Sequence, residues 1–324
     1  MPKGYFSQTL VVLFKQHVGL SELRSLLTGF DVVKDVPASE HWEFAGPALV
    51  IAYLPGVNGL VAVDIVDRAW PDHMGAPKDA PTLFGAWSMG YFGPFTYPGS
   101  LERALQHSSP DATDAARRHK AFVRIHVSYV FGADGNARLL PENYRPLPEL
   151  AFITGLASAL LQHPHALCYF NPNGELLLTK ANLDKQIAFA ATNAVRPLDV
   201  WMNFRLFNFD RPDGDPNWLM MDTVGNQQLD ILDQEIFFPK KDVSPDEAYR
   251  WLRNATGYML DNGEVIKDGD TMDGPGGRRQ QAKHFSVGLI SPPRRVLRWL
   301  PCGVADIPSV WLEEQQCPIQ RSSA

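Results

Sequence analysis

Histidines and carboxylates that stand close together in a sequence are the first candidates for metal binding or acid–base catalysis. Three such groups occur, namely His41 with Glu43, Asp64 with Asp67, and His163 with His165. Two histidines across a proline can contact one metal ion, but a third ligand must then come from elsewhere. Asp64 and Asp67 lie near the end of an expected strand, where the alternation of side chains places them on opposite faces. We therefore predict no metal site, no carboxylate pair and no bound cofactor.

The sequence also lacks the local motifs of the common enzyme classes. It has no glycine-rich phosphate loop, no dinucleotide-binding glycine pattern and no nucleophile elbow. The glycine cluster at residues 273–279 contains a proline and reads as a flexible loop. We predict that the chain is not an enzyme. The alternative that stays open is a site collected from distant segments, for example Asp64, His126 and His284, clustered with perturbed acidities.

Charged and aromatic residues supply the candidates for a binding surface. The expected contact residues form an acidic arc with one tryptophan in the second half of the chain and two aromatic residues in the first: Asp210, Asp213, Asp215, Trp218, Asp222, Asp230, Asp233, Glu235, Trp87 and Tyr91. Such carboxylates would steer a basic partner, and aromatic side chains often dominate interface energies. The basic run at residues 117–120 is short and reads as a solvated helix end.

Composition narrows the classes of partner and compartment. The 324 residues carry a formal charge of -6, which gives no electrostatic reason to approach nucleic acid. The first residues lack the pattern of a signal peptide, and no apolar run is long enough to span a membrane. Cys168, Cys302 and Cys317 are odd in number and widely spaced, as expected for reduced thiols. We expect a cytoplasmic protein that binds neither membranes nor nucleic acid directly.

The order of expected elements predicts an α+β fold with two domains, each a largely antiparallel sheet with packed helices. Residues 48–54 and 60–66 form one hairpin, and residues 166–170 and 175–179 form another. Regular elements are also expected as follows: strands at 8–14, 30–36, 121–131, 199–209, 218–224, 231–238, 284–290 and 296–300, and helices at 21–29, 100–107, 111–119, 149–162, 182–192 and 244–263.

Proline density sets the expected domain boundary. Three prolines fall within residues 141–148, which disfavours helix at each preceding position. The prediction is an N-terminal domain of residues 1–147 and an acidic C-terminal domain of residues 148–324. The segment 84–97, rich in glycine and aromatic residues, is expected to be an irregular loop.

Several segments together resemble a bacterial family of unassigned domains. The resemblance lies in four places: residues 41–47 (His-Trp-Glu-Phe-Ala-Gly-Pro), the hairpin through Val63 and Asp64, residues 84–87 with 92–94, and the helix at 244–263. Some members of that family resemble immunity proteins encoded beside type VI secretion toxins. In particular, the chain is similar to the immunity protein of a type VI nuclease toxin of restriction-endonuclease type.

This resemblance implies a cytoplasmic, non-catalytic antitoxin that binds a secreted nuclease and blocks its substrate groove. It carries no functional residues over, because its motifs are structural. A structural or adaptor component of a secretion system is the other alternative to an enzyme. The sequence leaves the identity of the toxin and the oligomeric state open.

Overall fold

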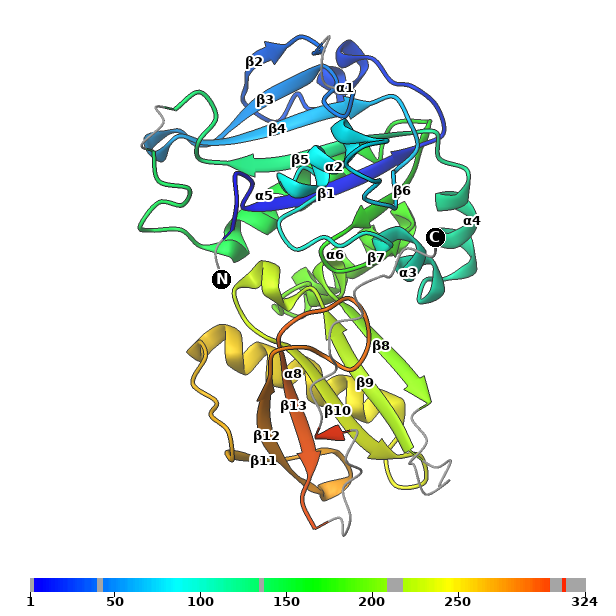
Figure 1. Ribbon diagram of the computed structural model, residues 1–324, viewed down its shortest axis with the longest axis vertical. Helices are drawn as coiled ribbons and strands as arrows, with labels where there is room; N and C mark the ends of the chain where they lie inside the picture. Colours follow the sequence, from blue (N-terminus) through cyan, green and yellow to red (C-terminus); the bar gives the residue numbers. More distant parts are fainter. Residues whose placement is uncertain (1–2, 40–42, 134–136, 209–217, 304–310, 313–324) are drawn as a thin grey trace. The chain divides into compact units, whose positions relative to one another are not determined.

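The chain folds into two compact units, Met1–Met202 (unit 1) and Asn203–Ala324 (unit 2). The computed structural model describes residues 3–39, 43–133, 137–208, 218–303 and 311–312. Within these residues lie eight α-helices and two mainly antiparallel sheets, one of seven strands and one of six. The fold class is therefore α+β, as the sequence predicted (Figure 1).

The sheet of unit 1 has the strand order β2-β3-β4-β5-β1-β6-β7, and all its neighbouring strands are antiparallel. β-Branched and aromatic residues dominate the central strands, which suits a sheet covered on both faces. The strand bounds are β1 Gln8–Phe14, β2 Val32–Val36, β3 Ala48–Leu54, β4 Gly59–Val66, β5 Ala121–Ser128, β6 Ala166–Asn171 and β7 Leu176–Leu178.

Helices cover both faces of this sheet. α5 packs against β1 and β5, with α1 and α6 beside it, while side chains of α2, α3 and α4 join the core on the other face. α5 is mostly apolar, and the face that it buries includes Leu150, Ile153, Leu156, Ala157 and Leu160. The helix bounds are α1 Leu20–Leu26, α2 Pro81–Ser88, α3 Ser100–Gln106, α4 Pro110–Arg117, α5 Pro146–Leu160, α6 Lys180–Thr192 and α7 Leu198–Trp201.

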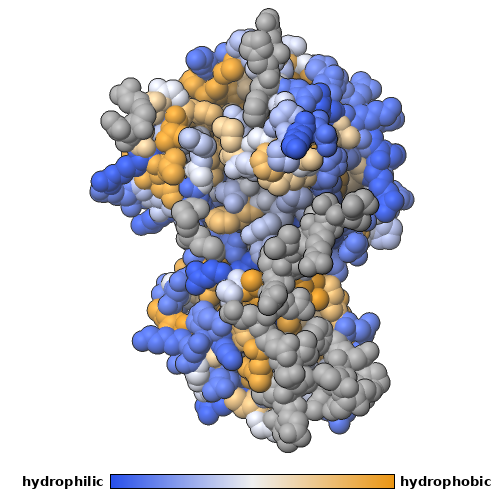
Figure 2. Space-filling view, in the orientation of Figure 1, coloured by the Kyte–Doolittle hydropathy of each residue, from blue (hydrophilic) through white to orange (hydrophobic). Residues whose placement is uncertain are grey.

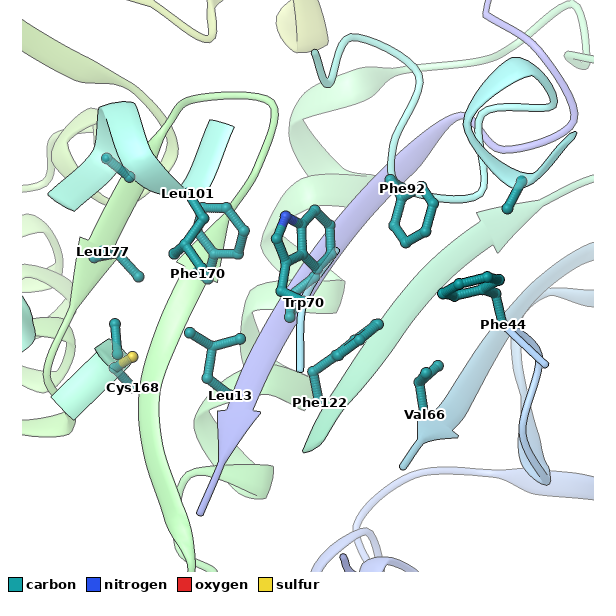
Figure 3. Close-up of a cluster of buried hydrophobic side chains, with 14 of the residues drawn as sticks. Leu13, Phe44, Val66, Trp70, Phe92, Leu101, Phe122, Cys168, Phe170 and Leu177 are labelled. Atoms are coloured by element: carbon teal, nitrogen blue, oxygen red, sulfur yellow. The ribbon is translucent and has the colours of Figure 1, made fainter. Parts of the chain in front are cut away.

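Trp70 lies at the centre of the core between the sheet and α2–α4 (Figure 3). Its ring makes edge contacts with Phe92, Phe122 and Phe170 at centroid distances of 5.1 to 5.3 Å. This geometry is the one that aromatic quadrupoles favour. Through this cluster, the long connection between β4 and β5 packs against one face of the sheet.

Unit 2 is a six-stranded sheet in the order β11-β12-β13-β10-β9-β8, with β10 and β13 as its parallel pair. α8 (Pro245–Asn262) contacts β10, and Ser244 caps it by accepting the backbone N–H of Glu247, as predicted. The strand bounds are β8 Asn203–Asn208, β9 Trp218–Val224, β10 Asp233–Pro239, β11 Thr271–Asp273, β12 Arg279–Phe285 and β13 Val296–Pro301.

The division between the units differs from the predicted boundary at 147/148. Residues 148–202 belong to unit 1, because β6 pairs with β1 and α5 packs on the same sheet. The prolines at 146 and 148 do not mark a linker. They lie in the first turn of α5, where a missing N–H costs nothing.

Four element predictions were also wrong in part. The strand expected at 284–290 is β12, which spans Arg279–Phe285. α2 spans Pro81–Ser88, so residues 84–88 of the expected irregular loop at 84–97 are helical. The alternation of polar and apolar residues at 121–131 predicts a strand with one wetter face, but β5 has both faces buried because its polar side chains find partners inside the fold. The expected strand at 199–209 begins with the short helix α7 and becomes β8 only at Asn203.

Candidate functional site

The acidic arc expected on the surface of unit 2 is largely an internal feature of the sheet. Asp222, Asp233 and Glu235 are buried, and so is Trp218. Asp230 is partly buried, while Asp210, Asp213 and Asp215 lie outside the described residues. The interpretation of these buried residues as a contact surface is therefore corrected.

Arginines from neighbouring strands neutralise the buried carboxylates. Arg205 pairs in register with Asp222, Asp222 with Glu235, and Glu235 with Arg298, so four charges form one row across β8, β9, β10 and β13. The Arg205 guanidinium bonds both oxygens of Asp222 at 2.9 and 2.5 Å. Arg298 Nε donates to Glu235 at 2.8 Å.

Arg294 completes this network from the segment before β13. It donates to Asp222 at 2.6 Å and lies 3.6 Å from Asp233. Burial raises the pKa of Asp233 to about 6. The charges of three arginines and three carboxylates thus cancel inside unit 2. Such a network is costly to break at one partner, because the other charge is left buried. Its role is structural.

Exposed carboxylates do gather elsewhere in unit 2. The acidic segment, residues 261–273, begins in the last turn of α8 and includes β11. Its charged residues are five acids and one base, and all are exposed: Asp261, Glu264, Lys267, Asp268, Asp270 and Asp273. His284 Nδ1 lies 2.6 Å from Asp268 Oδ1. Hydrogen bonds from the side chain and the backbone N–H of His284 lower the pKa of Asp268. This segment concentrates exposed carboxylates among the described residues of unit 2.

A half-open pocket of about 350 Å³ lies on the sheet of unit 1, over β2 to β5. Volumes of this order are typical of small-ligand sites. Its walls are mostly apolar, and they include Phe6, Val36, Leu60, Tyr91 and Phe131. Tyr91, predicted as a contact residue, is half-buried here, whereas Trp87 is buried in the core beside Trp70.

A buried ion pair forms part of the pocket floor. Asp64 on β4 and Arg124 on β5 are directly opposite each other, and Nε and Nη2 of Arg124 bond the carboxylate at 3.2 and 2.5 Å. The remaining guanidinium N–H groups donate to the carbonyls of Phe44 and Tyr91. Burial raises the pKa of Asp64, and the Arg124 charge opposes that rise. The pair is neutral as a unit.

His126, two residues beyond Arg124 on β5, is the second polar group of the floor. Its Nδ1 lies 2.9 Å from the Thr9 hydroxyl, and its ring stacks on Phe6 at 4.3 Å. Its Nε2 has no hydrogen-bond partner and stands 3.6 Å from Asp64 Oδ1, beyond hydrogen-bond length. Burial holds the pKa of His126 well below its ordinary value, so the imidazole is neutral.

The structure brings together two members of the distant constellation considered from the sequence. Asp64 and His126 meet in the pocket with perturbed acidities, while His284 belongs to unit 2 and pairs with Asp268. The pocket offers a neutral imidazole and a carboxylate for hydrogen bonding. Hydrophobic alternation predicted the strands but not their register, which alone places Asp64 beside Arg124.

The local pairs do not form metal sites among the described residues. Asp67 is exposed and lies near His17, apart from the buried Asp64. His163 Nδ1 accepts the backbone N–H of His165, which stabilises a turn. The His41 and Glu43 pair cannot be assessed because His41 lies outside the described residues. Across the described ranges, no three histidine, cysteine or acidic side chains are placed to hold a metal ion.

Comparison with known proteins gives one match. A family model described as a domain of unknown function, DUF4261, matches residues 222–300, which lie within unit 2 and include Asp222, Glu235 and Arg298 of its buried charge row. No curated protein and no solved structure matches the chain.

Within the described part of the chain, every helix is too short or too polar to cross a membrane. The face drawn in Figure 2 mixes hydrophilic residues with smaller hydrophobic areas on both units.

Proposed function

We propose that this chain is an immunity protein that binds and neutralises a type VI secretion nuclease effector by blocking its active-site groove. The protein would act in the cytoplasm as an inhibitor and not as a catalyst. The proposal rests first on the sequence resemblance carried by residues 41–47, the β3–β4 hairpin, residues 84–87 with 92–94, and α8.

The observation that carries the proposal is the exposure of the acidic segment. A nuclease groove is basic because it must hold a phosphate backbone, so an inhibitor of that groove needs carboxylates in solvent. The carboxylates of Asp261, Glu264, Asp268 and Asp270 satisfy this requirement. The buried carboxylates of the charge row do not, because arginines already neutralise them. We therefore assign docking to the acidic segment in place of the arc predicted from sequence.

The first experiment captures the partner. The tagged chain is expressed in its native cytoplasm, bound proteins are identified, and any nuclease among them is assayed with and without the chain. The proposal expects a nuclease that co-purifies in fixed proportion and loses its activity when bound. Failure to recover a nuclease, or recovery of one that stays active in the complex, would reject the immunity function.

A pair of charge-matched variants then tests the docking surface. The first neutralises the acidic segment with the four substitutions Asp261→Asn, Glu264→Gln, Asp268→Asn and Asp270→Asn. The control removes the same charge from exposed sites of unit 1 with Asp31→Asn, Asp67→Asn, Asp79→Asn and Asp114→Asn.

Loss of steering should slow association of the first variant about tenfold at low ionic strength, and the difference should shrink as salt is added. Association rates are measured by stopped-flow or surface binding across a salt series. Equal rates for the two variants would place the docking surface elsewhere while leaving inhibition itself intact.

A further inference from the structure

We infer that the pocket over β2 to β5 of unit 1 is a binding site for a small, uncharged, mainly apolar molecule that carries one hydroxyl group. This inference does not depend on the proposed immunity function. It rests on the shape of the pocket, on the chemistry of its walls and floor, and on one buried nitrogen that lacks a partner.

The walls select for an apolar and preferably aromatic body. Phe6 and Tyr91 meet edge to face at 5.2 Å, and Phe6 also contacts Phe131 at 5.9 Å, so aromatic rings line one side of the pocket. The sheet side is lined by small or aliphatic side chains such as Val50 and Ala62. The pocket is open because the strands beneath it carry small residues where larger ones would fill it.

The floor selects against a charged ligand. Arg124 is fully buried, and its guanidinium already meets Asp64 and two carbonyls, so it cannot serve as the counter-ion of an anion. Asp64 is likewise held by Arg124 and offers no free charge to a cation. An ionised ligand would lose its hydration on entering without gaining a partner charge. Lys34, which is exposed, is the other charged residue in the lining.

His126 supplies the polar contact. The Asp64 carboxylate 3.6 Å away favours the tautomer with the proton on Nε2, and the Thr9 hydroxyl then donates to Nδ1. The Nε2–H is a buried donor without an acceptor, and leaving a buried donor without a hydrogen bond is costly in free energy. Because Nε2 is itself buried, the pocket wall must shift slightly before a ligand hydroxyl can accept from Nε2–H and donate to Asp64 Oδ1. A hydroxyl fits this site better than a carbonyl because it serves both groups at once.

Three probes of one size test the inference on the full chain: β-naphthol, naphthalene and β-naphthoate. Amide-resonance NMR titrations give both the dissociation constant and the location of binding. We expect β-naphthol to shift amides of β4 and β5 and to bind about tenfold more tightly than naphthalene, the gain from satisfying one buried donor. The carboxylate should bind more weakly than β-naphthol.

Two variants separate the pocket from the anchor. Ala62→Phe fills the space and should abolish binding of both uncharged probes, whereas Ala188→Phe, at an exposed position of α6, should not. His126→Leu should reduce the ratio of naphthol to naphthalene affinity to about one, which a change in stability alone would not do. If Ala62→Phe does not fold, Val50→Phe serves the same purpose.

The inference is overturned by any of three results. These are no shift of the β4 and β5 amides at millimolar β-naphthol, tighter binding of β-naphthoate than of β-naphthol, or an unchanged affinity ratio in His126→Leu. The first would mean that the pocket holds only water. The second would mean that a positive charge governs the site, and the third that Nε2 is not the anchor.

Discussion

Glu149 makes the stability of unit 1 depend on pH in a predictable direction. This carboxyl is buried at the start of α5 and accepts hydrogen bonds from the Ser7 and Tyr129 hydroxyls. Burial raises its pKa from 4.5 to about 7. Because the native state holds this proton more tightly than the unfolded chain, the free energy of unfolding falls as pH rises from about 4.5 to about 7.

The size of the effect follows from the pKa difference. Each pKa unit corresponds to about 1.4 kcal/mol, so ionising Glu149 costs unit 1 about 3 kcal/mol across this range. Glu149→Gln keeps the shape and an acceptor for Ser7 and Tyr129 but cannot ionise. The variant should therefore lose this decline, and its advantage over the wild type should grow from pH 4.5 to pH 8.

Hydrogen exchange of the β1 and β5 amides reports unit 1 specifically, because these strands form the centre of its sheet. The difference between variant and wild type cancels the contributions of groups that titrate in both proteins. Glu142→Gln, at an exposed position, is the matched control and should leave the protection of these amides unchanged. Parallel pH profiles for Glu149→Gln and the wild type would refute the reasoning.

Two further substitutions test the packing of each unit, both read from urea unfolding. Arg298→Met leaves the Glu235 carboxylate buried without its cation and should destabilise unit 2 by about 3 to 5 kcal/mol; the double variant with Glu235→Gln should recover more than half of that loss. If the double variant is no more stable than the single one, the pair is not the cause. Gly46→Ala would place a β-carbon 1.5 Å from the Ile65 carbonyl oxygen, so we expect a loss of about 1 to 3 kcal/mol. Gly29→Ala, with open space around it, is the control.

Local sequence signals predicted most elements of the fold. The strand at 8–14 and the two hairpins of unit 1 follow from β-branched runs and turn residues, and the Ser244 cap begins α8 as predicted. These features depend on neighbours in the chain. The helix at 81–88 was missed because glycine and aromatic residues mask its pattern, although a proline stands at its first position.

The candidate sites depended on contacts between distant residues, which explains the errors there. Asp222 looked like a surface acid because its partners Arg205 and Arg294 lie 17 positions earlier and 72 positions later, and nothing local indicates either pair. Asp64 and Arg124 are separated by 60 positions and meet through strand register. The one sequence signal for such a buried ion pair is a charged residue within an apolar strand, since charged residues are seldom buried without a partner. Applied to Asp222, Glu235 and Arg298, it would have predicted buried pairing.

The most direct test of the central claim is a titration of the captured nuclease with this chain, with DNA cleavage as the readout. The account predicts that cleavage falls in proportion to added chain and stops at a fixed stoichiometric ratio, as tight blocking of the active-site groove requires. Cleavage that continues when the nuclease is saturated with the chain would contradict it.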